Sequence, residues 1–306
     1  MKTLKLHNGV EIPQIGLGTY PLFGNVLSKT LLHAYDYGYR LFDTADNYYN
    51  EEDLGYGLTE LYKLYGDVRK DLFLVTKISD ELYRQGNITP GANRGIYFWK
   101  NSPYMKDLNS CHNIVYKKVE DSLRFMKTDY IDLLLMHRPY PDFFEEIWYE
   151  MEMLYKEGKV RAIGVCSCYE RHLDRLLQSG SIVPMVNQIE TSPLNTKQDL
   201  IRYYESKGVK IMVYSPLQSL KFKGETEYHN YLKVLSLKYT KNMGQIVLRY
   251  NIQRGLIPIP KSTNPERLYA NIKIYDFELS NEEMMRIASF NKNLQYLPES
   301  KGCPGF

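Results

Sequence analysis

Short apolar runs alternate with amphipathic helical patterns along the whole chain, and this alternation restricts the fold more than any other feature. The runs are apolar throughout rather than at every second residue, which is typical of strands buried on both faces of a parallel sheet. Eight such strands, each followed by a helix, predict one parallel (β/α)8 barrel, the TIM-barrel fold, as a single domain over residues 1–306. The runs span residues 15–20, 39–42, 72–76, 131–136, 160–165, 184–187, 209–214 and 255–260. The expected helices span residues 27–37, 51–65, 113–125, 144–157, 171–178, 197–206, 231–239 and 265–273.

Two segments depart from this alternation. Residues 4–12 contain Asn8-Gly9, a strong hairpin signal, so we expect a β-hairpin that closes the bottom of the barrel. Residues 79–109 form a long loop-like insertion after the third run, and loops of that length are often functional. The alternative fold is a doubly wound open sheet. It would carry G-x-G-x-x-G after its first strand, and residues 16–25 lack that spacing.

Composition excludes several classes of protein. A net charge of +3 is too small to indicate a nucleic acid or a membrane surface as partner. No apolar run approaches the ~20 residues of a membrane-spanning helix, and the polar N-terminus is unlike a signal peptide. The four cysteines make no disulfide framework, which fits a reducing compartment. We therefore expect a cytoplasmic protein.

Polar side chains stand at the carboxyl ends of the predicted strands. Asp43, Lys77 and His137 follow the second, third and fourth runs, and in a barrel these ends share the rim that carries the active site. At the ends of the last four runs stand Cys166 with Ser167, Gln188, Tyr214 and Lys261. Asp43, Thr44 and Asp46 could instead cap a helix. The repetition at seven strand ends favours an active site.

These residue types suit proton transfer to a carbonyl group. We expect the ammonium of Lys77 to lower the pKa of the Tyr48 phenol from its reference value near 10, with Asp43 keeping that ammonium charged and in place. Tyr48 would then donate a proton to a carbonyl oxygen, and His137 would donate a hydrogen bond to it. No side chain supplies a hydride, so the set predicts a nicotinamide cofactor.

Residues 259–273 carry a second cofactor signal. Asn264 before Pro265 predicts a helix start, whose first-turn N–H groups favour an anion. Lys261, Ser262 and Arg267 add two cations and a hydroxyl, which suits the 2′-phosphate of NADP(H). The alternative is a capped surface helix with incidental charges.

Seven segments together resemble the aldo-keto reductase superfamily, in particular its bacterial-type NADPH-dependent carbonyl reductases. The segments are LFDTADNYYNE, LVTK, IDLLLMHRP, GKVRAIGV, VNQIE, YSPL and IPKSTNPERL, and the resemblance runs from Leu6 to about Leu297. It implies a (β/α)8 barrel that uses NADPH, with NADH as the alternative. It also implies a small carbonyl or alcohol substrate and, as the family's common case, a monomer or weak homo-oligomer.

The resemblance assigns roles residue by residue. Asp43, Tyr48, Lys77 and His137 match the catalytic residues, with Tyr48 as proton donor. The cofactor-binding residues expected are Thr19, Asp43, Cys166, Ser167, Gln188, Tyr214, Ser215, Leu217, Lys261, Ser262, Arg267 and Asn271. The substrate-binding residues expected are Tyr20, Tyr48, Tyr49, Trp99, His137 and Arg138. No metal is expected. Cys166-Ser167 departs from the family's usual Ser-Asn, so we expect fewer contacts to the nicotinamide carboxamide.

Three alternative functions can be compared for this chain. The first is reversible reduction of an aldehyde or ketone with NADPH. The second is a catalytically slow nucleotide-binding regulatory subunit of the same fold. The third, a metal-dependent hydrolase, needs a ligand set such as paired histidines, and His137 is the only histidine at a predicted strand end. We discard the third; the physiological substrate is not fixed by the sequence.

Overall fold

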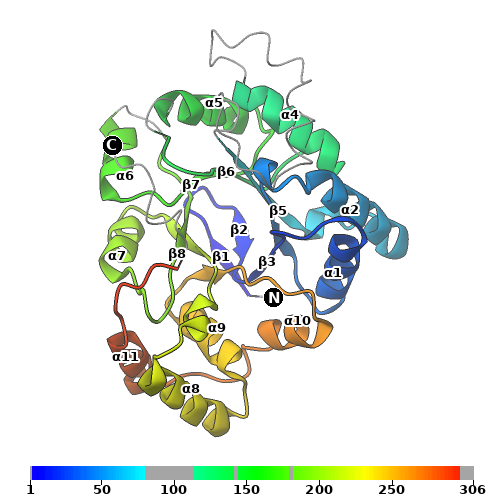
Figure 1. The fold of residues 1–306 in the computed structure, drawn as a ribbon. Helices are drawn as coiled ribbons and strands as arrows, with labels where there is room; N and C mark the ends of the chain where they lie inside the picture. Colours follow the sequence, from blue (N-terminus) through cyan, green and yellow to red (C-terminus); the bar gives the residue numbers. More distant parts are fainter. Residues whose placement is uncertain (1, 80–113, 141–143, 179–181, 297–306) are drawn as a thin grey trace.

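The computed structural model describes residues 2–79, 114–140, 144–178 and 182–296, and Figure 1 views the barrel with the strands at the centre and the helices around them. The eight strands of the main sheet are parallel and lie side by side in chain order. Gly18 N donates to Pro260 O (3.3 Å) and joins the first of these strands to the last. The predicted (β/α)8 barrel is confirmed. Its strands are β3 (Gly16–Gly18), β4 (Leu41–Asp43), β5 (Phe73–Ile78), β6 (Leu133–Met136), β7 (Ile163–Cys166), β8 (Val186–Glu190), β9 (Lys210–Tyr214) and β10 (Ile257–Pro258).

The strand boundaries differ from the apolar runs for identifiable reasons. The eighth run, residues 255–260, gives only the two residues of β10, since Pro258 and Pro260 have no N–H to donate to a ladder. The sixth strand extends beyond residue 187 through Gln188 and Glu190, which are polar yet buried. An apolar run therefore underestimates a strand whose end carries functional polar groups.

Helices fill the connections between strands, and two of them were not predicted. Both α9 and α11 follow a capping box, Asn242 with Gln245 and Ser280 with Glu283. Because α9 is buried along almost its whole length, polar residues such as Gln245, Arg249 and Asn251 are buried with the apolar ones. It therefore has no solvent-exposed polar face to mark a helical period. The helices described are α1 (Gly24–Asp36), α2 (Glu51–Tyr65), α4 (Ile114–Met126), α5 (Phe144–Lys156), α6 (Glu170–Gln178), α7 (Gln198–Ser206), α8 (Thr226–Tyr239), α9 (Met243–Gln253), α10 (Pro265–Ile272) and α11 (Asn281–Ser289).

The predicted N-terminal hairpin is present. Strands β1 (Thr3–Lys5) and β2 (Glu11–Pro13) pair antiparallel, and Asn8 donates a side-chain hydrogen bond to Arg161 O, just before β7 begins. The hairpin therefore lies at the amino-terminal end of the strands and leaves the opposite rim open. Of the insertion expected at residues 79–109, only Ser79 lies within the described residues. None of the described helices is long and apolar enough to cross a bilayer.

A buried carboxyl group opens α2. Glu51 is buried and accepts a hydrogen bond from Thr76 Oγ1 (2.6 Å). Burial raises the pKa of Glu51 to about 7, with the nearby Asp46 carboxylate adding to the effect and Thr76 opposing it. The protonated form thus fits the folded state better than the ionised one.

We expect the stability of Glu51→Gln, relative to that of wild type, to increase as the pH rises. The folded-state pKa is above the unfolded value, so the contribution of Glu51 is fully present below about pH 4.5 and is lost as the pH passes 7. The free energy of unfolding of the variant, relative to wild type, should rise by about 1–3 kcal/mol between pH 5 and 8. Urea denaturation across that range measures it, with exposed Glu60→Gln as control. Parallel pH profiles for wild type and Glu51→Gln would contradict the assignment.

Candidate active site

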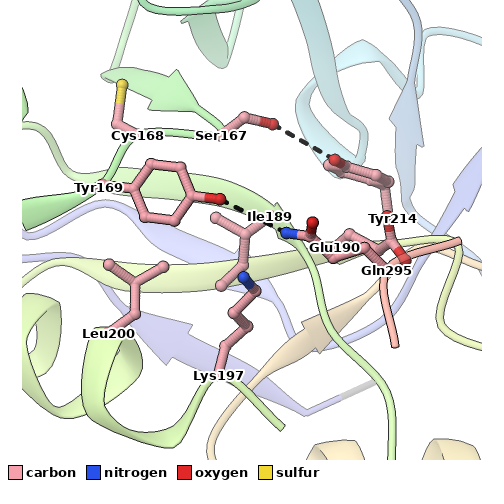
Figure 2. A pocket seen from close by; sticks show the side chains of 9 residues that line it. All are labelled: Ser167, Cys168, Tyr169, Ile189, Glu190, Lys197, Leu200, Tyr214 and Gln295. Carbon is pink, nitrogen blue, oxygen red and sulfur yellow. Dashed lines mark hydrogen bonds between the residues drawn. The ribbon is translucent and has the colours of Figure 1, made fainter. Parts of the chain in front are cut away.

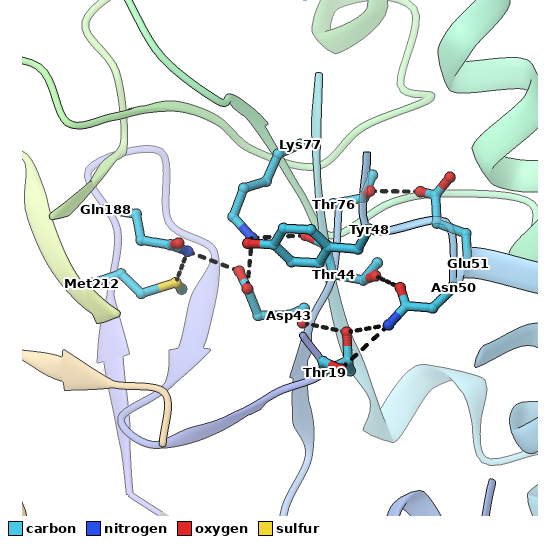
Figure 3. Close-up of polar contacts among 10 residues, drawn as sticks. All are labelled: Thr19, Asp43, Thr44, Tyr48, Asn50, Glu51, Thr76, Lys77, Gln188 and Met212. Carbon is cyan, nitrogen blue, oxygen red and sulfur yellow. Dashed lines mark hydrogen bonds and ion pairs between the residues drawn. The ribbon is translucent and has the colours of Figure 1, made fainter. Parts of the chain in front are cut away.

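Four of the predicted residues meet at the carboxyl end of the barrel, as Figure 3 shows for three of them. Asp43 ends β4, Lys77 lies near the end of β5 and His137 directly follows β6. Tyr48 ends the short 3-10 turn η1 (Asp46–Tyr48) that follows β4. Lys77 Nζ lies 2.6 Å from Asp43 Oδ1 and 3.3 Å from Tyr48 Oη. The rings of Tyr48 and His137 are 5.6 Å apart, edge to face.

Lys77 is fully buried inside the barrel wall. Its ammonium donates to Asp43, to Thr44 O (2.7 Å) and to Tyr48, so its three donors all have partners. Burial is the largest single effect and lowers the pKa of Lys77, but the Asp43 carboxylate, Tyr48 and Cys166 together outweigh it, so the pKa is raised. Lys77 therefore stays charged beside the Tyr48 phenol.

The expected lowering of the Tyr48 pKa is wrong as a net effect. Burial raises the pKa of the phenol, and although Lys77 lowers it, the net direction is upward. The sequence interpretation counted the ammonium and left out the loss of hydration. Tyr48 is consequently a protonated phenol at neutral pH with a cation against its oxygen.

His137 is neutral in this environment. Burial lowers its pKa well below the ordinary value, and the charges of Lys77 and Arg138 act in the same direction. Its buried Nδ1 has no hydrogen-bond partner among the described residues. A neutral imidazole carries one N–H, so His137 can donate a single hydrogen bond to a group beside Tyr48.

The alternative interpretation of Asp43, Thr44 and Asp46 as helix caps is wrong. Asn50 is the residue before α2, and its side chain makes no cap hydrogen bond. Asp43 pairs with Lys77, Thr44 donates to Asn50 Oδ1 (2.6 Å), and Asp46 pairs with Lys118 Nζ (2.5 Å). The two carboxylates thus make tertiary ion pairs, and the Thr44 hydroxyl bonds a side chain six residues on; none of the three caps a helix.

Asn50, which the sequence interpretation did not single out, anchors the first strand connection. Its Nδ2 donates to Leu22 O (2.9 Å) and lies 3.3 Å from both oxygens of Thr19. Thr19, an expected cofactor residue, is fully buried and donates to Asp43 O through its hydroxyl (3.0 Å). Thr19 therefore stands behind Asp43 and supports it from the backbone side. In the sequence, only the position of Asn50, two residues after Tyr48, could have indicated that it belongs to the site.

The residues expected at the nicotinamide lie on three neighbouring strands. Gln188 Nε2 donates to Asp43 Oδ2 (2.8 Å), which leaves its carbonyl oxygen to accept from a ligand. The hydroxyls of Ser167 and Tyr214 are 3.3 Å apart and form one wall of the small cavity in Figure 2. Cys166 is buried in the core cluster beside them.

Two of these expected cofactor residues have a strained backbone. Ser167 (φ 53°) and Ser215 (φ 52°) occupy the left-handed region, directly after β7 and β9. Non-glycine residues are uncommon there, and such strain clusters at ligand sites. Asn tolerates this region better than Ser, so the Ser167 departure has a backbone cost as well as a chemical one.

The expected phosphate end lies at the start of α10. Asn264 accepts from Arg267 N (2.8 Å) as N-cap, with Pro265 at the first helical position. Lys261 and Arg267 are exposed, whereas Ser262 and Asn271 are buried. The predicted helix start is confirmed, and both cations face solvent at its amino end. Leu217, the remaining expected cofactor residue, precedes the 3-10 turn η4 (Gln218–Lys221) after β9.

The expected substrate residues surround Tyr48 in part. Tyr20 is 58% exposed, and its ring lies 4.9 Å from that of Tyr48. Tyr49 follows η1 in the left-handed region, and Arg138 is partly buried after His137. Trp99 lies outside the described residues. Within those residues, no group of three His, Cys, Asp or Glu side chains could hold a metal ion.

Comparisons with known proteins identify the family of this chain. The family model described as aldo/keto reductase matches residues 14–292. Glyoxal reductase of Bacillus subtilis (strain 168) is 36% identical over 292 residues, covering 95% of this chain and 93% of that protein. Methylglyoxal reductase DkgA of Escherichia coli (strain K12) is 32% identical over 298 residues, covering 97% and 96%.

A solved structure extends the likeness to three dimensions. The Bombyx mori aldo-keto reductase, in complex with NADP, superposes with a TM-score of 0.81 at 32% identity, covering 98% of this chain and 96% of that chain. The chain therefore belongs to the aldo/keto reductase family.

Proposed function

We propose that this chain reduces an aldehyde or ketone to the alcohol with NADPH, and that Tyr48 donates the proton. The observation that carries the proposal is the single ammonium of Lys77, which contacts the Asp43 carboxylate and the Tyr48 hydroxyl at one rim of the barrel. A charged lysine against a protonated phenol is suited to stabilise the phenolate that remains after proton transfer.

The residues of this site fit a nicotinamide dinucleotide. Gln188 offers an amide oxygen, and Ser167 and Tyr214 offer hydroxyls, to a carboxamide. Lys261 and Arg267 at the start of α10 suit a phosphate monoester, which favours NADPH over NADH. A bound nicotinamide supplies the hydride that no side chain can.

The directions of the pKa shifts support Tyr48 as the proton donor and His137 as the hydrogen-bond donor. Burial keeps the Tyr48 phenol protonated before the reaction, which a proton donor requires. Lys77 lowers the cost of the phenolate as it forms, so its effect is largest in the transition state. Neutral His137 donates to the same carbonyl oxygen and orients it. The steps are reversible, so the same groups would serve alcohol oxidation.

The relatives support small α-oxoaldehydes as substrates to test first. Two are named for glyoxal and methylglyoxal reduction. The exposed ring of Tyr20 beside Tyr48 also offers a flat apolar surface, which suits an aromatic carbonyl compound.

We expect Tyr48→Phe to lose most carbonyl reduction while still binding NADPH. Removal of a general acid typically costs about 10²–10⁴ in rate, and the phenyl ring keeps the packing against Tyr20. NADPH consumption with methylglyoxal, glyoxal and benzaldehyde measures it, and NADPH fluorescence measures binding. The control is Tyr56→Phe, an exposed tyrosine on α2. Equal rates for wild type and Tyr48→Phe would exclude Tyr48 as donor. Binding without turnover in either protein would favour the regulatory-subunit alternative.

We expect Ser167→Asn to tighten NADPH binding. Asn adopts the left-handed backbone of position 167 more readily and adds an amide that can reach the carboxamide. One additional hydrogen bond of about 1 kcal/mol corresponds to a roughly five-fold lower Kd. Fluorescence titration compares it with Ser167→Ala, which keeps the strained backbone and has no polar group. A Kd equal to or weaker than that of wild type would contradict the prediction.

A further inference from the structure

The short turn that carries Tyr48 has few internal contacts that could fix its position. It comprises three residues, and the next residue, Tyr49, has φ 55°, a conformation that is costly for a bulky side chain. Its internal bonds are Tyr48 N to Ala45 O (3.1 Å) and Tyr49 N to Asp46 O (3.3 Å). So short a turn needs support from its surroundings.

Asp46, the first residue of the turn, provides that support through a buried ion pair. Its Oδ2 lies 2.5 Å from Lys118 Nζ, and the two side chains are 5% and 3% exposed. The backbone N–H of Ser79 donates to both carboxylate oxygens (3.1 Å each). Lys118 also donates to Ser79 O (2.7 Å), so the three residues form a closed set of contacts.

The contacts among Asp46, Ser79 and Lys118 join the Tyr48 turn to the end of β5, and the separation of these two segments sets the distance between Tyr48 and Lys77. Asp46 is two residues before Tyr48, and Ser79 is two residues after Lys77. On the other side of Lys77, Thr76 donates to Glu51 (2.6 Å), which begins the helix after the turn (Figure 3). The 3.3 Å contact between Lys77 Nζ and Tyr48 Oη therefore lies between two cross-links.

General stability is the simpler explanation for a buried ion pair, but it does not explain the location. A buried pair contributes little net stability over apolar residues of the same size, because both charges lose their hydration. A second buried carboxylate, Asp132, pairs with Arg69 (2.8 Å) and with Arg161 (2.6 Å) and lies before β6, at the other end of the barrel. Asp132 serves as a reference: it is a buried, ion-paired aspartate at the opposite end of the barrel from the Tyr48 turn.

We propose that Asp46 and Lys118 are positioning residues, which hold the Tyr48 turn against the end of β5 so that the phenol stays within reach of Lys77. The assignment rests on the proposed reductase function. In this assignment Lys118 acts through Asp46 and Ser79, its contacts in the structure, and not on the reacting atoms.

The test compares Lys118→Met, Asp46→Asn and the double variant with Asp132→Asn as reference. Lys118→Met keeps the apolar stem and removes the ammonium, and the double variant leaves no uncompensated charge. We expect kcat for methylglyoxal reduction to fall by roughly 100-fold, the size associated with a misplacement of about 1 Å. The KM and the Kd of NADPH should stay within about three-fold of wild type. Asp132→Asn should lower the melting temperature without this loss of kcat.

A second readout does not depend on turnover. Hydrogen exchange at the backbone amides of residues 46–50 should accelerate in the Asp46 and Lys118 variants and stay unchanged in Asp132→Asn. If Lys118→Met does not fold, kcat and hydrogen exchange are both measured on the double variant. A kcat within about three-fold of wild type with unchanged exchange would overturn the proposal. If wild type itself reduces no carbonyl, the proposed function fails, and exchange alone decides whether the turn is held in this way.

Discussion

The ion pair between Lys77 and Asp43 is the interaction on which the rest of the site depends. A fully buried ammonium is tolerated only with an opposite charge and satisfied donors, and Asp43 with Thr44 O and Tyr48 provides both. Gln188 holds the second oxygen of Asp43 from across the barrel, so that carboxylate is fixed from two strands. Since these partners come from β4, β5 and β8, the site exists only when the barrel is closed.

Two opposing effects on Tyr48 explain why a lysine is buried there at all. Burial favours the neutral phenol, and the ammonium favours the phenolate. With burial dominant, the phenol keeps its proton until an acceptor arrives, and the ammonium then offsets the charge that develops. A more exposed lysine would be screened by water and would stabilise that charge less.

The sequence predicted the parts of the structure that depend on local pattern. Apolar runs located the strands, and because parallel strand ends share a rim, Asp43, Lys77 and His137 could be brought together before any coordinates were known. The structure added helix α9, which has no solvent-exposed face, and the buried contact of Lys118. A lysine is ordinarily exposed, and only the tertiary contact with Asp46 explains its burial. Trp99 and its segment remain a prediction.

Left-handed residues lie at both ends of several barrel strands, and they differ in type between the two ends of those strands. Glycine supplies positive φ before β4, β7, β9 and β10, where the chain only has to turn. Beyond the ends of β4, β7 and β9, the same conformation is held by Tyr49, Ser167 and Ser215. Each non-glycine residue costs of order 1–3 kcal/mol in such a region, so it persists only where the surroundings fix it. Ser167 N, for instance, donates to Gln188 O (2.9 Å) and continues the sheet ladder. Lys127, which precedes β6, has the same conformation at the amino end, so strain is not exclusive to the carboxyl-end rim. At that rim, however, it falls on Tyr49, Ser167 and Ser215, which are all expected site residues, whereas the four glycines at the amino end are not.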